Sequence, residues 1–334
     1  MPDIIFSEGS GLNDALYGNW QAPLQAVIMK RAEAFEQKSL YKKIFKTVNS
    51  THFGESYTGM TSMAGFKPGG ENAEAPIDGF RQTYDKLLKN VRWQDTFAIS
   101  REMIADSMFV EMKRRPEAFV TGFYRTQEEF AACLLGTPLD GASKSVVFGG
   151  WTFDCSCADG EPLFDPAHPS KTGGASQCNQ FADSLTAETL GELETKMQNF
   201  TDDNGKILTV APNTIIIPND ADTKNAAFKA AGSEKDPITA NNAFNYQVGR
   251  WNIIVWPYLN AYVDAGDAPW ILFDPDYNDM YYGAVWQERE PLEIDSYVDR
   301  KTKANVWDGY ARFTAGFHDW RAFACGGIAG AASL

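Results

Sequence analysis

The feature that most constrains the fold is a helical pattern of about 36 residues that directly follows a long glycine-rich segment. Ser100 is placed to cap the free backbone N–H groups, and Glu102 lies near the positive end of the helix dipole. Apolar residues then recur three, four or seven positions apart up to Gly136: Ile104, Met108, Met112, Phe119, Phe123, Phe130 and Leu134. One helix, or two nearly collinear helices broken at Pro116, would span roughly 50 Å. Few compact enzymes place so long a helix directly after a long hairpin.

The segment before this helix predicts a protruding hairpin. Residues 54–82 are punctuated by glycine and proline and contain little to bury. Residues 91–99 then alternate apolar and polar side chains, which is typical of a strand with one covered face. A loop of this length without a core of its own is usually functional or disordered, so we expect it to need a partner surface.

The N-terminal region predicts an arm followed by a basic helix. Residues 1–20 are rich in Gly, Asn and Ser and show little periodicity, as in an extended arm. A helical pattern begins at Pro23, and its apolar stripe from Leu24 to Phe45 lies opposite several lysines. The basic side is either a solvated face or an interaction surface, and the sequence leaves both open.

The rest of the chain alternates short elements. Residues 137–183 are loop-rich. We expect helices at 186–200 and 221–231 and strands at 214–217, 251–255 and 270–273, which together make an α/β or α+β lobe. Residues 291–323 predict antiparallel strands, and a tail of small residues runs from 326 to 334.

Composition limits the class of protein. The 334 residues, 44% of them hydrophobic, suffice for a large core. No apolar run approaches the roughly 20 residues that span a bilayer, and no signal peptide begins at Met1, so we expect a soluble, intracellular product. Five cysteines at irregular spacing indicate reduced thiols rather than a disulfide framework. The net charge of −14 disfavours general attraction to DNA phosphates, so we expect the protein to enclose any nearby DNA rather than to bind its phosphates tightly.

Three cysteines and a histidine could in principle form a tetrahedral zinc site: Cys155, Cys157, His168 and Cys178. Structural zinc sites usually use two pairs of closely spaced ligands, whereas His168 and Cys178 are far apart and His168 directly precedes a proline. We therefore expect no metal here. Phe164 and His168 instead would fix a loop through packing and one hydrogen bond.

Other candidate chemistry is weak. Residues 274–279 suggest a calcium loop, but Asp279 stands where an EF-hand needs Gly and Val285 where it needs Glu, so we expect a turn. The sequence lacks the phosphate-binding, nucleophile-elbow and zinc-protease motifs, and its three histidines offer little material for a catalytic site. We predict no enzyme activity, no catalytic residues and no cofactor.

The run Gly160-Glu-Pro-Leu163-Phe164-Asp-Pro-Ala-His168-Pro169 resembles the Gly-x-x-Leu-Phe-x-x-x-His-Pro loop of the major capsid proteins of tailed double-stranded DNA phages. In that family the loop is structural, and the corresponding residues here are Leu163, Phe164, His168 and Pro169. The order of arm, basic helix, glycine-rich hairpin, long helix, this loop, the strand at 214–217 and terminal strands also resembles the family. The resemblance covers nearly the whole chain and implies an α+β fold, the Hong Kong 97-like or Johnson fold.

The resemblance also implies a division of the chain. Residues 1–50 would be an N-terminal arm, 51–97 an extended loop, 98–136 and 288–322 a peripheral domain with a spine helix, 137–184 a loop-rich connection, and 185–287 with 323–334 an axial domain. The implied function is a structural major capsid protein that self-assembles into hexamers and pentamers of an icosahedral head around double-stranded DNA.

The same resemblance suggests partners and contacts. The main partner would be the chain itself, with a possible separate scaffolding protein, a portal and a decoration protein; the head would assemble in the host bacterial cytoplasm and enclose DNA without sequence-specific binding. The arm follows Met1 directly, so we expect any scaffold to be a separate protein. Candidate contacts between subunits are Phe66, Lys67, Glu71 and Trp93. Some family members cross-link a buried loop lysine to a neighbour, but Lys67 has little apolar cover, so we predict no cross-link.

Two other interpretations stay open at this point. A bacterial encapsulin, a protein nanocompartment shell, shares the fold but is usually shorter. A metal- or carboxylate-dependent hydrolase is the alternative from a different class.

Overall fold

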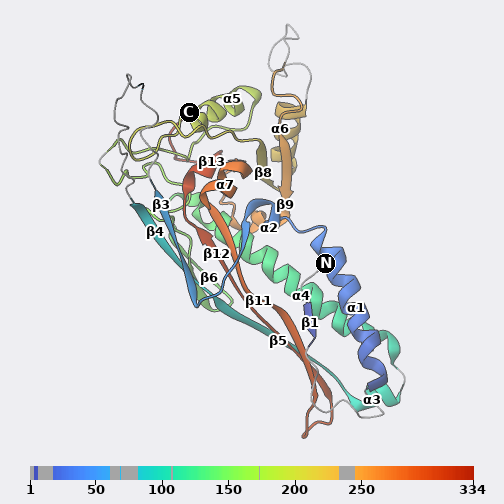
Figure 1. Ribbon diagram of the computed structural model, residues 1–334. Helices are drawn as coiled ribbons and strands as arrows, with labels where there is room; N and C mark the ends of the chain where they lie inside the picture. The colour runs from blue at the N-terminus through green and yellow to red at the C-terminus, as the bar shows by residue number, and fades with distance from the viewer. Residues whose placement is uncertain are drawn as a thin grey trace.

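The computed structural model describes residues 4–6, 18–60, 68, 82–106, 108–172, 174–232 and 245–334. The molecule is elongated: a lobe of short elements occupies one end, and a long sheet with two helices beside it runs away from that lobe (Figure 1). No helix in the described ranges is both long and apolar enough to cross a membrane.

The long sheet is built on one hairpin. Strands β11 (Ala284–Val298) and β12 (Asn305–Phe317) pair antiparallel, and β5 (Val91–Ile99) pairs antiparallel with β12. On the other edge, β1 (Ile4–Phe6) and β2 (Lys46–Asn49) both pair parallel with β11. The predicted antiparallel strands are therefore present, although β11 begins before position 291.

Two long helices cover one face of this sheet. Helix α1 (Gly18–Glu36) lies beside α4 (Phe109–Gly136), and the short helix α3 (Arg101–Ala105) precedes α4 at the far end (Figure 1). Ser100 caps α3 as predicted, because its hydroxyl accepts a hydrogen bond from the Met103 backbone N–H at 3.3 Å.

The predicted long helix is interrupted, but the break predicted at Pro116 is wrong. The backbone N–H groups of Asp106 and Met108 bond back to Glu102 and Met103, at 2.8 and 3.0 Å, and close α3 before α4 begins. Pro116 lies inside α4. The helix continues past the missing hydrogen bond because its next turns are held by packing, as in Phe119, which contacts the sheet.

The N-terminal helix is also shorter than its apolar stripe suggested. It ends at Glu36, and the chain then turns into α2 (Tyr41–Ile44). One carboxylate oxygen of Glu128, on α4, accepts hydrogen bonds from the Ser39 hydroxyl at 3.0 Å and the Leu40 backbone N–H at 2.7 Å. The other oxygen accepts from the indole N–H of Trp256 at 3.0 Å. Glu128 thus joins α4, the start of α2 and the lobe.

Aromatic side chains fill the space between the helices and the long sheet. Phe313 on β12 stacks on Trp93 and Trp286, with ring centroids 4.7 and 5.0 Å apart. Further along β12, a Cβ atom at Gly309 would lie 2.3 Å from the Phe119 ring. The absence of a side chain there lets α4 approach the sheet closely.

The lobe contains a second sheet, in the order β13, β10, β8, β9. These strands are β13 (Phe323–Gly326), β10 (Trp270–Phe273), β8 (Thr214–Pro218) and β9 (Asn252–Trp256), flanked by α5 (Ala187–Gln198), α6 (Ala221–Gly232) and α7 (Pro275–Tyr281). Every residue of β8 is buried, as its run of apolar residues predicted. The turn expected at residues 274–279 is wrong, because Asp274 accepts a hydrogen bond from the Tyr277 N–H at 3.0 Å and caps α7.

Two small hairpins and three short 3-10 helices complete the described chain. The hairpins are β3 (Gly54–Met60) with β4 (Gln82–Lys89), and β6 (Ser145–Phe148) with β7 (Trp151–Asp154); the 3-10 helices are η1 (Thr137–Asp140), η2 (Pro257–Tyr262) and η3 (Trp320–Ala322). The buried ammonium group of Lys86 on β4 donates to the Ser156 hydroxyl at 2.8 Å and pairs with Asp154. The predicted protruding hairpin is therefore anchored to the body at its base.

Candidate functional site

His168 lies in the interior of the loop-rich segment between β7 and α5. Its side chain is fully buried and stacks on Trp320 with ring centroids 4.2 Å apart. Its Nδ1 atom lies 2.7 Å from a carboxylate oxygen of Asp159, and its Nε2 atom lies 3.2 Å from the side-chain oxygen of Asn179. Leu163 and Phe164 are also fully buried in the same loop.

The amide of Asn179 fixes the role of the histidine. Its NH2 group donates to the backbone carbonyls of Leu163 and Phe323, at 2.8 and 3.1 Å, so its oxygen must face His168. Both ring nitrogens of His168 therefore face side-chain oxygens of the same chain, those of Asp159 and Asn179. These two contacts and the stacking on Trp320 hold the ring in place.

The cysteines are placed as unreactive core residues. Cys155 and Cys157 are buried, Cys178 is half-buried, and all three are free thiols. Burial raises the pKa of each of the three thiols above its ordinary value, and it raises the pKa of Cys157 well above that value. Within the residues that the structure describes, no group of three or more His, Cys, Asp or Glu side chains is arranged to hold a metal ion.

A second polar cluster, which the sequence did not reveal, surrounds Arg321. Its guanidinium pairs with Asp319 at 3.2 Å and with Asp203 at 3.6 Å, and donates to the Thr201 carbonyl at 3.0 Å. The Tyr277 hydroxyl donates to the other oxygen of Asp319 at 2.8 Å. Burial is the largest influence and would raise the pKa of Asp319, but the charge of Arg321 together with hydrogen bonds from Arg321 and Tyr277 holds that pKa below its ordinary value.

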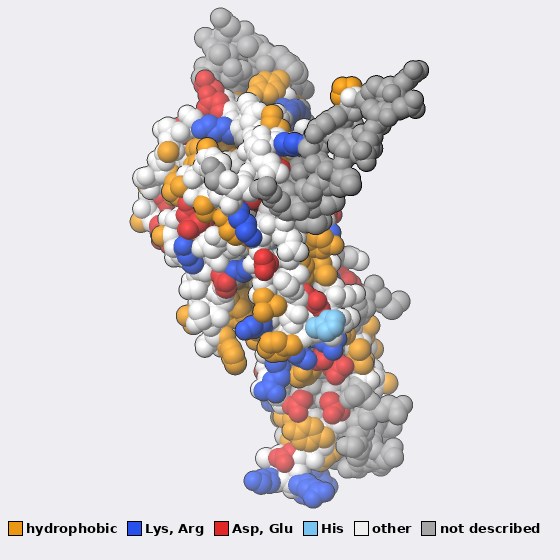
Figure 2. Space-filling view, turned by 60° about the vertical axis from the view of Figure 1, so that its left-hand side comes forward, with side chains coloured by type: hydrophobic (Ala, Val, Ile, Leu, Met, Phe, Trp, Pro, Cys, Tyr) orange, Lys and Arg blue, Asp and Glu red, His pale blue; other side chains and the backbone are white. Residues whose placement is uncertain are grey.

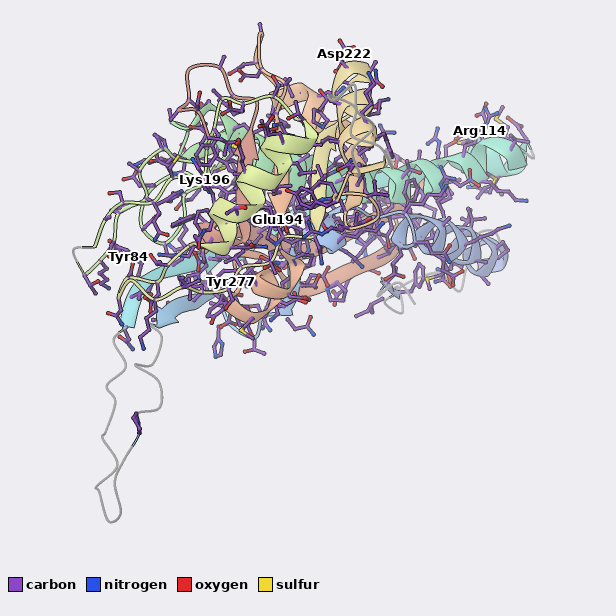
Figure 3. All side chains as sticks on the ribbon, turned by 90° about the horizontal axis from the view of Figure 1, so that it is seen from above. Tyr84, Arg114, Glu194, Lys196, Asp222 and Tyr277 are labelled. Carbon is purple, nitrogen blue, oxygen red and sulfur yellow. The ribbon has the colours of Figure 1, made fainter. Side chains whose placement is uncertain are left out.

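A hollow of about 300 Å³ opens beside these two clusters. Its lining includes Tyr84, Asp159, Tyr277, His318 and Arg321. Tyr84 and Tyr277 lie on the same side of the molecule, far from Arg114 on α4 (Figure 3). The acids of the hollow already accept hydrogen bonds or ion pairs from described residues.

A family model described as "Phage capsid protein" matches residues 84–326, which is more than two thirds of the chain. The chain belongs to the phage capsid protein family. A comparison with curated protein sequences found no match to this capsid protein.

Solved structures show the same fold. A structure from Mycobacterium phage Patience is similar with a TM-score of 0.50 at 11% identity, over 98% of this chain and 93% of that one. The holo-SrpI encapsulin complex from Synechococcus elongatus PCC 7942 gives 0.50 at 8% identity, over 86% of each chain. A structure from Microbacterium phage Oxtober96 gives 0.49 at 12% identity, over 86% and 90%. At such low identity the likeness to the two structures with a TM-score of 0.50 concerns the fold alone, so the capsid protein has the predicted α+β, Hong Kong 97-like fold.

Of the four residues suggested as contacts between subunits, only Trp93 lies within the described part of the chain. Phe66, Lys67 and Glu71 lie outside the described residues. Trp93 lies in the aromatic cluster of its own chain, and its indole N–H donates to the Phe313 carbonyl at 3.0 Å. A contact of Trp93 with a neighbouring subunit stays a prediction.

The surface of the capsid protein exposes several large apolar side chains that the sequence analysis did not single out. Val147 and Trp151, near the turn between β6 and β7, are 68% and 66% exposed. Met280 at the end of α7 is 71% exposed, and Tyr281 and Tyr282 follow it. Exposed apolar groups of this kind suit contact with other protein surfaces.

Proposed function

We propose that this major capsid protein self-assembles into hexamers and pentamers of an icosahedral phage head that encloses double-stranded DNA. The observation that carries the proposal is the family match over residues 84–326. The protein is structural and non-enzymatic in this proposal, and it requires no cofactor.

The hairpin of β3 and β4 supports an assembly role. It forms a two-stranded sheet separate from both larger sheets, and a few side-chain contacts attach it to the body, such as those of Tyr57 on β3 and Lys86 on β4. A two-stranded hairpin is marginally stable in water by itself. A neighbouring copy that covers this hairpin would supply the missing packing.

The division into regions is part of the proposal. The described elements accord with a peripheral domain formed by α4 and the β11–β12 hairpin, and with an axial domain formed by the second sheet. We propose the boundaries given by the sequence: arm 1–50, extended loop 51–97, peripheral domain 98–136 and 288–322, connection 137–184, and axial domain 185–287 with 323–334.

The net charge of the subunit indicates how the head would hold DNA. A net charge of −14 gives the subunit a repulsive field toward phosphate, so packaged DNA would be enclosed without sequence-specific binding. A portal is required for DNA entry in this proposal, and a separate scaffold and a decoration protein are further partners. The site of assembly would be the host bacterial cytoplasm, and the final location the virion.

Electron microscopy of the expressed protein tests the proposal. The chain should form capsomers or closed shells, alone or when co-expressed with the neighbouring genes. A protein that stays monomeric at high concentration under both conditions would refute the proposed function.

The encapsulin alternative rests on the fold alone. It predicts that the shells contain a cargo enzyme and that the gene for the shell protein lies beside the gene for that enzyme. Shells that contain DNA, and a terminase or portal gene next to this one, would exclude it.

A further inference from the structure

The outer face of the long sheet, opposite α1 and α4, carries an unusual set of charges near its far end. Asp295 on β11 pairs directly with Asp308 on β12 across the hairpin. Glu293 lies two residues from Asp295 on the same face, and both are exposed. We call Glu293, Asp295 and Asp308 the acidic face.

The acidic face is unfavourable in the isolated chain. Like charges directly opposite each other on neighbouring strands destabilise a sheet. Asp308 accepts a hydrogen bond from the Thr96 hydroxyl at 2.7 Å, but no Lys or Arg among the described residues forms an ion pair with any of the three acids. Asp308 and burial, followed by Asp299 and Asp295, raise the pKa of the adjacent Tyr297, which indicates a negative potential at this surface.

The turn that joins the same two strands has the opposite charge. Arg300, Lys301 and Lys303 are exposed there, and we call them the basic tip. The carboxylate of Asp299 accepts from the backbone N–H groups of Lys301 and Thr302, at 3.2 and 3.1 Å, so the turn is organised from within. Figure 2 shows Lys and Arg side chains at the lower end of the molecule and acidic side chains just above them.

The basic tip cannot reach the acidic face of its own hairpin. Asp295 pairs with Asp308, and the strands continue to Val298 and Asn305 before the turn begins. At about 3.4 Å per residue, Asp295 lies roughly 14 Å from the start of the turn at Asp299. The tip of another molecule is not held at this separation.

We infer that the basic tip of one copy docks on the acidic face of a neighbouring copy. The inference rests on the proposed assembly and names the residues of one of its interfaces. The contact is head-to-tail, because the tip and the face are different surfaces of the same hairpin, and such a contact forms a ring when the rotation between neighbouring copies closes around a symmetry axis. It would relieve the repulsion between Asp295 and Asp308 once the copies assemble.

Disulfide trapping tests the geometry. In the variant Asp295→Cys/Lys301→Cys, the two sulfurs of one chain are too far apart to bond, because a disulfide needs Cα atoms within about 7 Å. Oxidation of assembled particles should therefore give covalent oligomers on a non-reducing gel, and the largest band gives the number of copies in the ring. Each single-cysteine variant is the control and should not form this series.

Well-formed particles of the double variant that oxidise only to monomers would overturn the inference. That result would leave the proposed function intact, since the particles themselves would be present. Failure of the wild-type chain to form particles would instead refute the proposed function.

A charge-reversal cycle provides a second test that needs no oxidation. Arg300→Glu/Lys301→Glu reverses the tip, and Asp295→Lys/Asp308→Lys reverses the face. Each should lower the assembled fraction at least about tenfold, because like charges then meet at the interface. The four substitutions together should restore it to within about threefold of wild type.

A control for the face reversal makes the same change of +4 in net charge at another surface. Glu188→Lys/Glu192→Lys alters two exposed acids of α5 and should assemble like wild type. Thermal melting of each free subunit shows whether it is folded. If both reversals assemble like this control, or if the combined variant is no better than the worse of its parents, the inference is wrong.

Discussion

Glu128 offers a graded test of how the lobe is attached to the long helix. One of its oxygens accepts from Ser39 and the Leu40 N–H, and the other accepts from the indole of Trp256, which is fully buried. Glu128→Gln keeps one acceptor oxygen but turns an NH2 group toward either the indole or the Leu40 N–H. Glu128→Ala removes both acceptors.

The expected losses follow from the groups left without partners. A buried donor without an acceptor costs about 1–3 kcal/mol, so Glu128→Gln should cost about 2 kcal/mol and Glu128→Ala about 4 kcal/mol. For 334 residues, the entropy of unfolding is about 0.7 kcal/mol per kelvin, at roughly 2.1 cal/mol/K per residue. The melting temperature of the free subunit should therefore fall by about 3 °C and about 6 °C.

Scanning calorimetry of the unassembled subunit measures these shifts. Glu129→Ala is the matched control, because Glu129 is the next residue of α4 and forms no hydrogen bond with Ser39, Leu40 or Trp256; it should lower the melting temperature by less than about 1 °C. Equal melting temperatures for the Gln and Ala variants, or for Glu128→Ala and the control, would refute the account of Glu128 as a joint.

Four further outcomes are expected. Replacement of residues 60–80 by a short Gly-Ser turn should leave the melting of the free subunit nearly unchanged and abolish particles; wild-type shells from the shortened chain, seen by sedimentation, would contradict the role of the hairpin. Denaturing gels of mature particles should show single chains, and a ladder abolished by Lys67→Ala would contradict the absence of a cross-link. Elemental analysis should find no stoichiometric zinc, and zinc lost on Cys178→Ser would show the opposite. Because Arg321 lowers the pKa of Asp319, the stability from that pair is present above an unfolded pKa of about 3.8 and is lost as the pH falls below it. Arg321→Met raises that pKa instead, so urea titrations should show the largest deficit of the variant near pH 7 and a smaller one near pH 4; a deficit that grows toward pH 4 would contradict this assignment.

Local patterns predicted the elements whose partners are close in sequence. The apolar run at 214–217 gave β8, and Thr186 caps α5 as expected, accepting from the Thr189 N–H at 3.1 Å. Backbone hydrogen bonds and the spacing of apolar residues decide such elements within a few turns of the chain. The order of these elements was sufficient to identify the fold.

Features set by distant contacts escaped the same analysis. The gap between α3 and α4 does not disturb the apolar spacing, so the pattern showed a continuous helix. The cluster around Arg321 combines residues from α7, η3 and the segment that contains Asp203, and no local motif links Asp203 to it. Asn179 is one of the hydrogen-bond partners of His168, and only the folding of the loop brings these two side chains together.

The pairing of the long sheet has a consequence for the timing of folding. The ribosome completes strand β5 at Ile99, long before it makes the partner strand β12, which begins at Asn305. Strands β1 and β2 are likewise made long before their partner β11. At about 5–20 residues per second, β5 would remain unpaired for roughly 10–40 s during synthesis. The nascent chain thus exposes apolar strand surface until β12 has been made. Protection of this surface during synthesis would then affect how many copies reach assembly, in addition to the stability of the folded subunit.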